Sequence, residues 1–507
     1  MDQQNINQPT PYAFPPRKPP VTFSTGKGEL AFGVWIIVFS MALCNCLFFA
    51  GPSLGFALAV LALLGGTCLY LVRRGHRFGW YEKALLALCA VLAAGFIKSD
   101  DGLMKFLMVL LLMAVPSLSF TIAAGQNRWH PGGVLSLLDA PRAAFGLGLG
   151  CMGEMGRGLR QAFRSAGTLG KKTGAVGLGL LAAVPVVAVM VPLLMSADAA
   201  FEGLLDLLPE FEVGEALTTV ILGAFLGVML YTRGVALHHN PKSDRAPRTP
   251  KGIHPLTVNT ILFAAAAVYL VYLLSQLAYF VGGFSGILPE DFTLADYARR
   301  GFFEMCELCA VNLTLIALGV GLVQKKDRTP LTTRIVCLFI GLITVFLVAA
   351  ASAKMFLYIG SYGLTRARVM TEVFMLWLGV TTVLVCVWLF RSKLPYMKVS
   401  LLVGLILCAG LFWADVDSQV ARYNVRAYQR GYLETVDVDH LEQLSSGVVP
   451  WLEELAHDGD PNVAKKARTA LKNYDLYESD DLRGWNWTAH RAAEILEAYQ
   501  TETEDER

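Results

Sequence analysis

Residues 335–353 read IVCLFIGLITVFLVAAASA, nineteen consecutive positions without a charged side chain. A helix of about 20 apolar residues is long enough to cross the hydrocarbon core of a bilayer. Similar runs recur along the chain, so the sequence predicts an all-α, polytopic transmembrane helical bundle of about eleven spans. The predicted spans are 30–50, 52–72, 84–97, 103–123, 174–195, 216–233, 257–280, 300–323, 334–358, 370–390 and 398–415. The run at 84–97 is the shortest and the least secure of them.

The composition agrees with this class. Hydrophobic residues make up 54% of the 507 positions, charged residues 17%, and the mean hydropathy is +0.49. The net charge of +2 gives no indication of nucleic-acid binding. Nearly all of the ten cysteines lie inside apolar runs, which predicts small buried side chains rather than disulfides or metal ligands. This interpretation includes the Cys306-x-x-Cys309 pair, which lies within a predicted span.

The chain divides into five predicted segments. Prolines in residues 1–29 predict a disordered, cytoplasmic tail. Four spans follow in 30–123, and a cytoplasmic amphipathic segment in 124–173 combines apolar residues with arginines that are attracted to lipid phosphate. About seven more spans occupy 174–416. Residues 417–507 carry 19 Asp and Glu against 10 Lys and Arg and predict an acidic, helical, extracytoplasmic unit packed against the bundle.

The orientation follows from the basic residues. Most lysines and arginines of the short connections fall on one side if the N-terminus is inside, whereas the connection 196–215 contains six carboxylates and no Lys or Arg. The positive-inside rule therefore predicts a cytoplasmic N-terminus. With eleven spans the C-terminal unit is outside, and with ten it is inside.

Three short motifs are judged by their context. Gly148-x-Gly150-x-x-Gly153 matches the dinucleotide fingerprint in letters but follows no strand. His238, His239 and His254 occur in a basic loop with no carboxylate or cysteine pattern that would complete a metal site. Asp100-Asp101 resembles the acidic pair of lipid-linked glycosyltransferases but lies in a much smaller loop. No catalytic residue, cofactor or metal is therefore predicted.

The polar residues of greater interest gather at the outer ends of the last four spans. Glu304 and Lys354 lie at similar depth in neighbouring spans, and an ionisable side chain at that depth is costly unless it pairs or reaches the interface, so a Glu304–Lys354 contact is the natural hypothesis. The predicted polar cluster comprises Arg299, Arg300, Glu304, Lys354, Tyr362, Arg366, Arg368, Asp415, Asp417 and Arg422. Either it fastens the C-terminal unit to the bundle, or it forms an outward pocket for an anionic ligand.

The same segments carry a family resemblance. YARRGFFE at 297–304, SYGLTRAR at 361–368 and ADVDSQVARYNV at 414–425 resemble the bacterial domain-of-unknown-function families 4153 and 4173, over about 259–507. The resemblance implies a multi-pass protein of the bacterial cytoplasmic membrane and brings no activity, substrate or catalytic residue with it.

The expected function is accordingly non-enzymatic. We expect an envelope sensor, accessory or scaffold whose partners are the lipid bilayer and an envelope protein or anionic ligand at the outer face. Two alternatives stay open. A transporter or flippase would need polar residues along a path at mid-membrane depth, and an outer-face enzyme on a lipid-linked substrate would need an acid or base such as Glu304 or Asp417 in a roomy cavity.

Overall fold

The computed structural model describes residues 27–129, 139–153, 190, 213–239, 252–284, 294–323, 329–476 and 481–505. Within these ranges the regular structure is helical, as predicted, apart from one isolated bridge between Ile253 and Val323. The helices of the bundle are α1 Lys27–Asn45, η1 Cys46–Ala50, α2 Leu54–Arg73, α3 Trp80–Gly95, α4 Gly102–Ala123, α5 Asp139–Pro141, η3 Arg142–Gly146, α9 Val213–His239, α10 Pro255–Phe284, α11 Leu294–Leu322, α12 Leu331–Tyr362, α13 Arg366–Phe390 and α14 Tyr396–Ala414.

Nine helices within the described ranges are long and apolar enough to cross a membrane. They carry many exposed large apolar side chains, such as Phe263 and Val268 on α10 and Phe106 on α4, which are suited to contact with lipid. Helix α3 has 16 residues and is not one of the nine, and the predicted span 174–195 lies outside the described residues. The protein is therefore an all-α, polytopic membrane protein.

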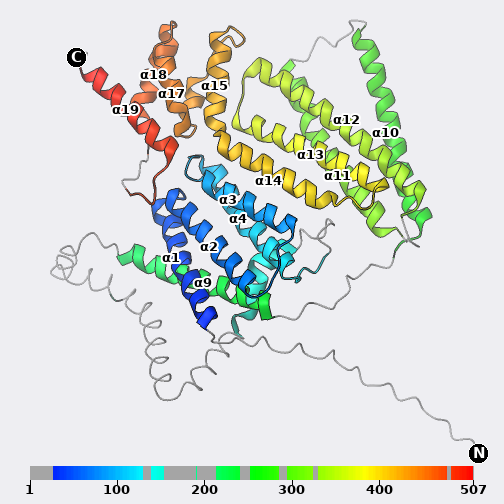
Figure 1. Cartoon of the computed structure of the whole chain (residues 1–507). Helices are drawn as coiled ribbons and strands as arrows, with labels where there is room; N and C mark the ends of the chain where they lie inside the picture. The colour runs from blue at the N-terminus through cyan, green and yellow to red at the C-terminus, as the bar shows by residue number, and fades with distance from the viewer. Residues whose placement is uncertain are drawn as a thin grey trace, which may run out of the picture.

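The long helices form two groups joined through α14 (Figure 1). In the first group α1 packs along α9 and α2, and α3 packs between α2 and α4. In the second group α11, α12 and α13 pack in sequence, with α10 against α12. Helix α14 contacts α13 on one side and α3 on the other, so it connects the two groups.

The bundle has two ends of different character. At the end that we call the basic end, Arg74 pairs with Glu29 at 3.0 Å and Lys398 lies over the ring of Tyr81 at 4.8 Å. At the other end, which we call the tail end, the main chain of Leu54 donates to Trp485 and that of Trp487 donates to Ile97. Since α3 begins at the basic end and finishes at the tail end, it runs the full distance between them antiparallel to α2 and α4.

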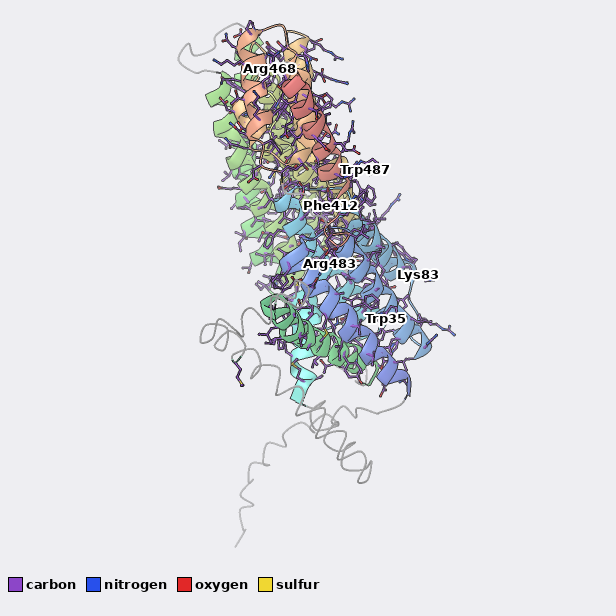
Figure 2. All side chains as sticks on the ribbon, turned by 90° about the vertical axis from the view of Figure 1, so that its left-hand side faces the viewer. Trp35, Lys83, Phe412, Arg468, Arg483 and Trp487 are labelled. Carbon is purple, nitrogen blue, oxygen red and sulfur yellow. The ribbon has the colours of Figure 1, made fainter. Side chains whose placement is uncertain are left out.

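The last helices form a C-terminal unit at the tail end. They are α15 Val416–Gln429, α16 Val438–Glu442, η4 Ser446–Val448, α17 Val449–Ala456, α18 Pro461–Asn473 and α19 Trp487–Asp505. Figure 2 shows Arg468 of this unit toward one end of the molecule and Trp35 toward the other, with Phe412 and Arg483 between them.

One hydrophobic core continues from the bundle into the C-terminal unit. The rings of Phe96 and Phe412 meet edge to face with centroids 4.9 Å apart, and Phe56 lies 4.7 Å from Phe96. The same cluster of buried side chains includes Val420 of α15 and Leu452 of α17. Burial of apolar surface is the main stabilising contribution to such packing, so the C-terminal unit and the bundle stabilise each other.

Candidate functional site

The candidate site lies where the tail end of the bundle meets the C-terminal unit. Three chain segments converge there: the loop between α3 and α4, the turn between α12 and α13, and the junction of α14 with α15. Each segment places its polar residue at a helix terminus. Asp101 and Asp417 lie at the N-terminal ends of α4 and α15, where free N–H groups and the helix dipole favour a carboxylate, whereas Arg366 at the start of α13 depends on these carboxylates for its stabilisation. Asp101 is the N-cap of α4 and accepts hydrogen bonds from the main chain of Leu103 at 2.9 Å and Met104 at 3.2 Å.

The centre of the site is the ion pair between Arg366 and Asp417. Arg366 is the first residue of α13, and its Nε donates to Asp417 Oδ1 at 2.8 Å while its Nη2 contacts Asp417 Oδ2. The same Nε is 3.3 Å from Asp101 Oδ2. Asp417 is fully buried and also accepts a hydrogen bond from the main chain of Ser445 at 2.9 Å. One arginine therefore ties α4, α13 and α15 together in the geometry of a two-point guanidinium–carboxylate pair.

Asp415 is the most constrained residue of the site. It joins α14 to α15 with φ of 53°, the one positive φ of a non-glycine residue within the described ranges. Its side chain is 5% exposed, and its Oδ1 has no hydrogen-bond partner. Burial, together with the neighbouring charge of Asp417, raises the pKa of Asp415 to about 6. Gly447 packs directly against this carboxyl group: a Cβ at position 447 would lie 2.4 Å from Asp415 Oδ2. The C-terminal unit therefore covers the carboxyl group of Asp415 closely.

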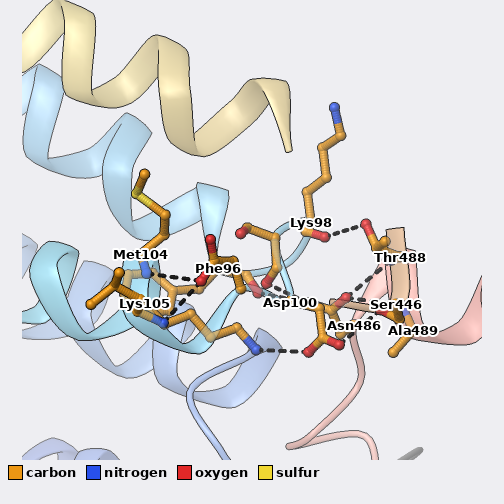
Figure 3. A network of polar contacts seen from close by, with 12 residues as sticks. Phe96, Lys98, Asp100, Met104, Lys105, Ser446, Asn486, Thr488 and Ala489 are labelled. Carbon is orange, nitrogen blue, oxygen red and sulfur yellow. Dashed lines mark hydrogen bonds and ion pairs between the residues drawn. The ribbon is translucent and has the colours of Figure 1, made fainter. Parts of the chain in front are cut away.

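A second polar network surrounds the loop between α3 and α4 (Figure 3). Asp100 accepts a hydrogen bond from the Ser446 hydroxyl at 2.8 Å and pairs with Lys105 at 3.3 Å. Lys98 donates to the carbonyl of Trp413, the penultimate residue of α14, at 2.6 Å. The side-chain amide of Asn486 donates to the carbonyls of Phe96 and Ser99 at 3.2 and 2.9 Å. The loop is thus held by α14 and by two separate parts of the C-terminal unit.

The turn between α12 and α13 is recognised by an asparagine of α15. Asn424 accepts from the main-chain N–H of Leu364 at 2.7 Å and donates to its carbonyl at 2.8 Å. Gly363 precedes this contact with φ of 75°, and a Cβ on it would lie 2.6 Å from Asn424 Oδ1. Glycine is therefore required there both for the left-handed backbone and for the close approach.

A third attachment joins the C-terminal unit to the first helices. Arg483 contacts Asn45 Oδ1 and lies 3.4 Å from Glu215 Oε1, while Asn45 donates to that same Glu215 oxygen at 2.6 Å. Asn45 ends α1 and Glu215 lies in the first turn of α9, so the C-terminal unit is attached to both helices through Arg483.

Of the ten residues in the predicted cluster, the structure brings Arg366, Asp415 and Asp417 together. Arg368 lies nearby, where its Nη1 donates to the carbonyl of Tyr362 at 3.1 Å and its guanidinium stacks 4.2 Å from the Tyr358 ring. Tyr362 itself is 54% exposed. Arg422 is on the exposed side of α15, away from the ion pair. Lys354 is half-buried on α12.

The remaining predicted residues, Arg299, Arg300 and Glu304, belong to α11, but their side chains lie outside those that the structure describes. The Glu304–Lys354 contact therefore stays a prediction.

Sequence reasoning missed several residues of the site. Asp101, Asp100 and Lys98 were not assigned to the cluster, although Asp-Asp-Gly before an apolar run is a recognisable N-cap signal. Asn424 and Gly363 occur inside the quoted family motifs, yet their contact across the chain has no local sequence signal. Gly447 and Asn486 likewise became visible only through their contacts with Asp415 and with the α3–α4 loop.

The dismissed motifs have structural explanations where they are described. A Cβ on Gly148 would lie 2.6 Å from the carbonyl of Met229, so this glycine allows close packing against α9. All ten cysteines are free thiols, including Cys306 and Cys309. Within the described residues no group of three or more His, Cys, Asp and Glu side chains is arranged to hold a metal ion.

These features define a polytopic α-helical membrane protein whose C-terminal helical unit is fastened to one end of the bundle by the ion pair of Arg366 with the buried Asp417 and by hydrogen bonds. The chain belongs to the family described as Domain of unknown function (DUF4153), whose model matches residues 36–455. The match confirms the first of the two resemblances and extends it to the early helices, and the resemblance to family 4173 is not shown. No curated protein and no solved structure matches the chain.

Proposed function

We propose that the protein is a non-enzymatic envelope scaffold that holds its C-terminal unit on the extracytoplasmic face of a bacterial cytoplasmic membrane, where an envelope protein binds it. The observation that carries this proposal is the contact of Arg366 with both Asp417 and Asp101. Because the central charges are engaged with one another across three helices, their evident use is to fix the position of the C-terminal unit.

The orientation is supported by the distribution of charge. Arg73, Arg74, Arg77 and Arg391 lie at the basic end, and the acidic C-terminal unit lies at the tail end. The positive-inside rule then directs the basic end to the cytoplasm. Helices α4 and α9 both run from the tail end to the basic end. The proposed topology of eleven spans counts the nine long apolar helices, α3 and the predicted span 174–195, which lies outside the described residues.

The two alternatives have less support. Both carboxylate oxygens of Asp417 already accept hydrogen bonds, whereas a general acid or base must reach a substrate proton. At mid-membrane depth the fully buried Asn312 bonds Tyr269 and donates to Thr344 at 3.0 Å. Polar groups that satisfy one another in this way favour helix packing over a transport path.

The partner can be tested by photo-crosslinking in intact cells. Benzoylphenylalanine is placed at Leu482, which is 77% exposed on the C-terminal unit, and at the control position Phe263, which is exposed on α10. The scaffold proposal expects a discrete adduct at position 482 that weakens when Asp417→Asn loosens the unit. Position 263 should label lipid alone. Absence of any protein adduct from position 482 would contradict the proposal.

The orientation is tested separately with a membrane-impermeant thiol reagent on variants without the ten native cysteines. Lys465→Cys, on the exposed side of α18, should react in intact cells, and Arg391→Cys, at the basic end, should react only after permeabilisation. The reverse pattern would place the C-terminal unit in the cytoplasm.

A further inference from the structure

A long apolar cavity lies among α1, α2, α4 and α9, and none of the residues of the polar cluster lines it. Its volume is about 190 Å³. The lining positions on α2 run from Phe56 to Thr67, which corresponds to roughly 16 Å along a helix that rises about 1.5 Å per residue. The cavity is therefore narrow and runs along the helix axes, from the tail end toward the basic end.

The walls are almost entirely aliphatic and aromatic, with Leu47, Val60 and Leu112 among them. An engineered apolar cavity of about 150 Å³ stays free of water and takes up benzene, so a space of this size and lining favours an apolar guest. Met113, which lines the cavity, is 38% exposed, so one wall residue also reaches the outer surface of the bundle.

One cationic side chain stands at the basic end of this cavity. Arg233 lines it with a side chain that is 7% exposed. Its Nη1 donates to the hydroxyl of Ser117, and its Nε has no hydrogen-bond partner. The ion pairs recorded among the described residues, such as those of Arg74, Arg142 and Arg366, do not include Arg233.

An arginine in this position requires compensation. Arg233 and Ser117 each lie six residues before the end of their helices, about 9 Å inside the bundle at the helical rise. A buried guanidinium within a membrane is costly unless an anion or polar groups replace its hydration, and the serine hydroxyl satisfies only one of its donors. The chemistry that fits both features is an aliphatic chain with one anionic group.

We infer that this cavity binds a single-chain aliphatic anion from the membrane, with the chain along α2 and α4 and the anionic group on Arg233. Guanidinium groups pair well with both carboxylate and phosphate, so a fatty acid and an alkyl phosphate share the required chemistry. This site is separate from the polar cluster and does not depend on the proposed scaffold function.

The test measures thermal unfolding of the full-length, delipidated protein in a neutral detergent. The probes are dodecanoate, dodecyl phosphate, dodecanol and dodecylamine, each below its own micellar concentration. Binding to the folded state should raise Tm by about 2–4 °C in a saturable manner for the anions, with no rise from the alcohol or the amine. The anion that saturates at the lower concentration identifies a free carboxylate or a phosphate as the natural group.

Three variants locate the effect. Arg233→Met should abolish the rise in Tm, and Val60→Phe should abolish it by filling the cavity while Arg233 is kept. Arg391→Met, an exposed arginine at the basic end, should respond as the unmodified protein does. If Arg233→Met does not fold, the response of Val60→Phe alone tests whether the anions bind in the cavity. An equal rise from dodecanol, an unchanged response of Val60→Phe, or no rise from either anion would overturn the inference.

Discussion

Asn424 of α15 exchanges two hydrogen bonds with the main chain of Leu364, sixty residues earlier in the chain. A primary amide offers a donor and an acceptor side by side, as a peptide group does. The side chain therefore substitutes for a strand neighbour in a protein whose described part is otherwise helical, and it fixes the turn that presents Arg366.

Replacing Asn424 with alanine removes both bonds and leaves the partly buried main chain of Leu364 unpaired. At about 1 kcal/mol for each bond, with an added cost for unsatisfied groups, the free energy of unfolding should fall by about 2–3 kcal/mol. Thermal unfolding in detergent measures the change. Gln429→Ala on the same helix, which loses an exposed bond to Glu454, is the matched control and should change Tm little.

Asp417→Asn leaves the half-buried Arg366 with only part of its counter-charge. Removal of one partner of a buried ion pair typically costs about 3–5 kcal/mol, so the C-terminal unit should detach at lower temperature and become sensitive to protease near Asp415. A second change, Arg366→Met, should restore part of the loss, because the uncompensated charge is then absent. Equal protease resistance of Asp417→Asn and the unmodified protein would show that the pair does not hold the unit.

Asp415 makes stability depend on pH in a defined direction. Its pKa is raised to about 6 in the folded protein from the ordinary value of 3.8, so the folded state binds more protons between these values. Stability should therefore increase as pH falls from 7 toward 4, by up to about 3 kcal/mol from this group. Asp415→Asn should lose this pH dependence, because the titrating carboxyl group is absent. It should also be more stable than the unmodified protein at pH 7, because asparagine carries no charge to bury and tolerates the left-handed backbone.

The measurement is Tm against pH for both proteins, and the control is Asp439→Asn. Asp439 pairs with Lys466 in an exposed contact, so its replacement should leave the pH profile nearly unchanged. A profile of Asp415→Asn that parallels the unmodified protein would assign the pH dependence to other groups, such as Asp101, whose pKa is also raised by burial.

The pairing of Glu304 with Lys354 is tested by abundance in the membrane. Helices α11 and α12, which carry the two residues, pack against each other. If the side chains pair, Glu304→Gln should reduce abundance several-fold, and adding Lys354→Met should recover part of it. Normal abundance of both single variants would remove the pairing from consideration.

Gly95→Val tests the contact between α3 and α14. A Cβ on Gly95 would lie 2.6 Å from the ring of Phe412, so a branched side chain must displace that ring. Overpacking of this kind usually costs about 1–3 kcal/mol, and thermal unfolding reports it. Gly102→Val, at a position with open space around its Cβ, is the control.

Much of the bundle could be predicted because the hydrophobic runs carry the information locally. The runs at 334–358 and 370–390 coincide with the interiors of α12 and α13. The weak prediction was 84–97, where α3 begins at Trp80. The apolar run is interrupted at its start by Tyr81, Glu82 and Lys83. Tyr81 and Glu82 are nevertheless buried in the bundle, and an average hydropathy scale does not predict that burial.

The sequence indicates at which end of the bundle the polar residues gather, but only partly which of them contact one another. Membrane topology alone brings Arg366, Asp415 and Asp417 to one end, since helix ends alternate between the two sides. Topology does not say which carboxylate an arginine contacts. The N-cap of α4 brings Asp101 within 3.3 Å of Arg366, and no local feature of the sequence predicts that contact. Arg422 is not part of the site. Val420 and Val425 form the buried face of α15, and Arg422 lies on its exposed face.

The hydrogen bond between Asp100 and Ser446 joins residues 346 positions apart. During synthesis the α3–α4 loop is complete long before the residues that cover it exist, and contacts of such sequence separation form late. Until then Asp100 has only its local pair with Lys105, and the loop lacks the cover that η4 supplies. The order of synthesis therefore makes the closing of this loop one of the last steps in the folding of the chain.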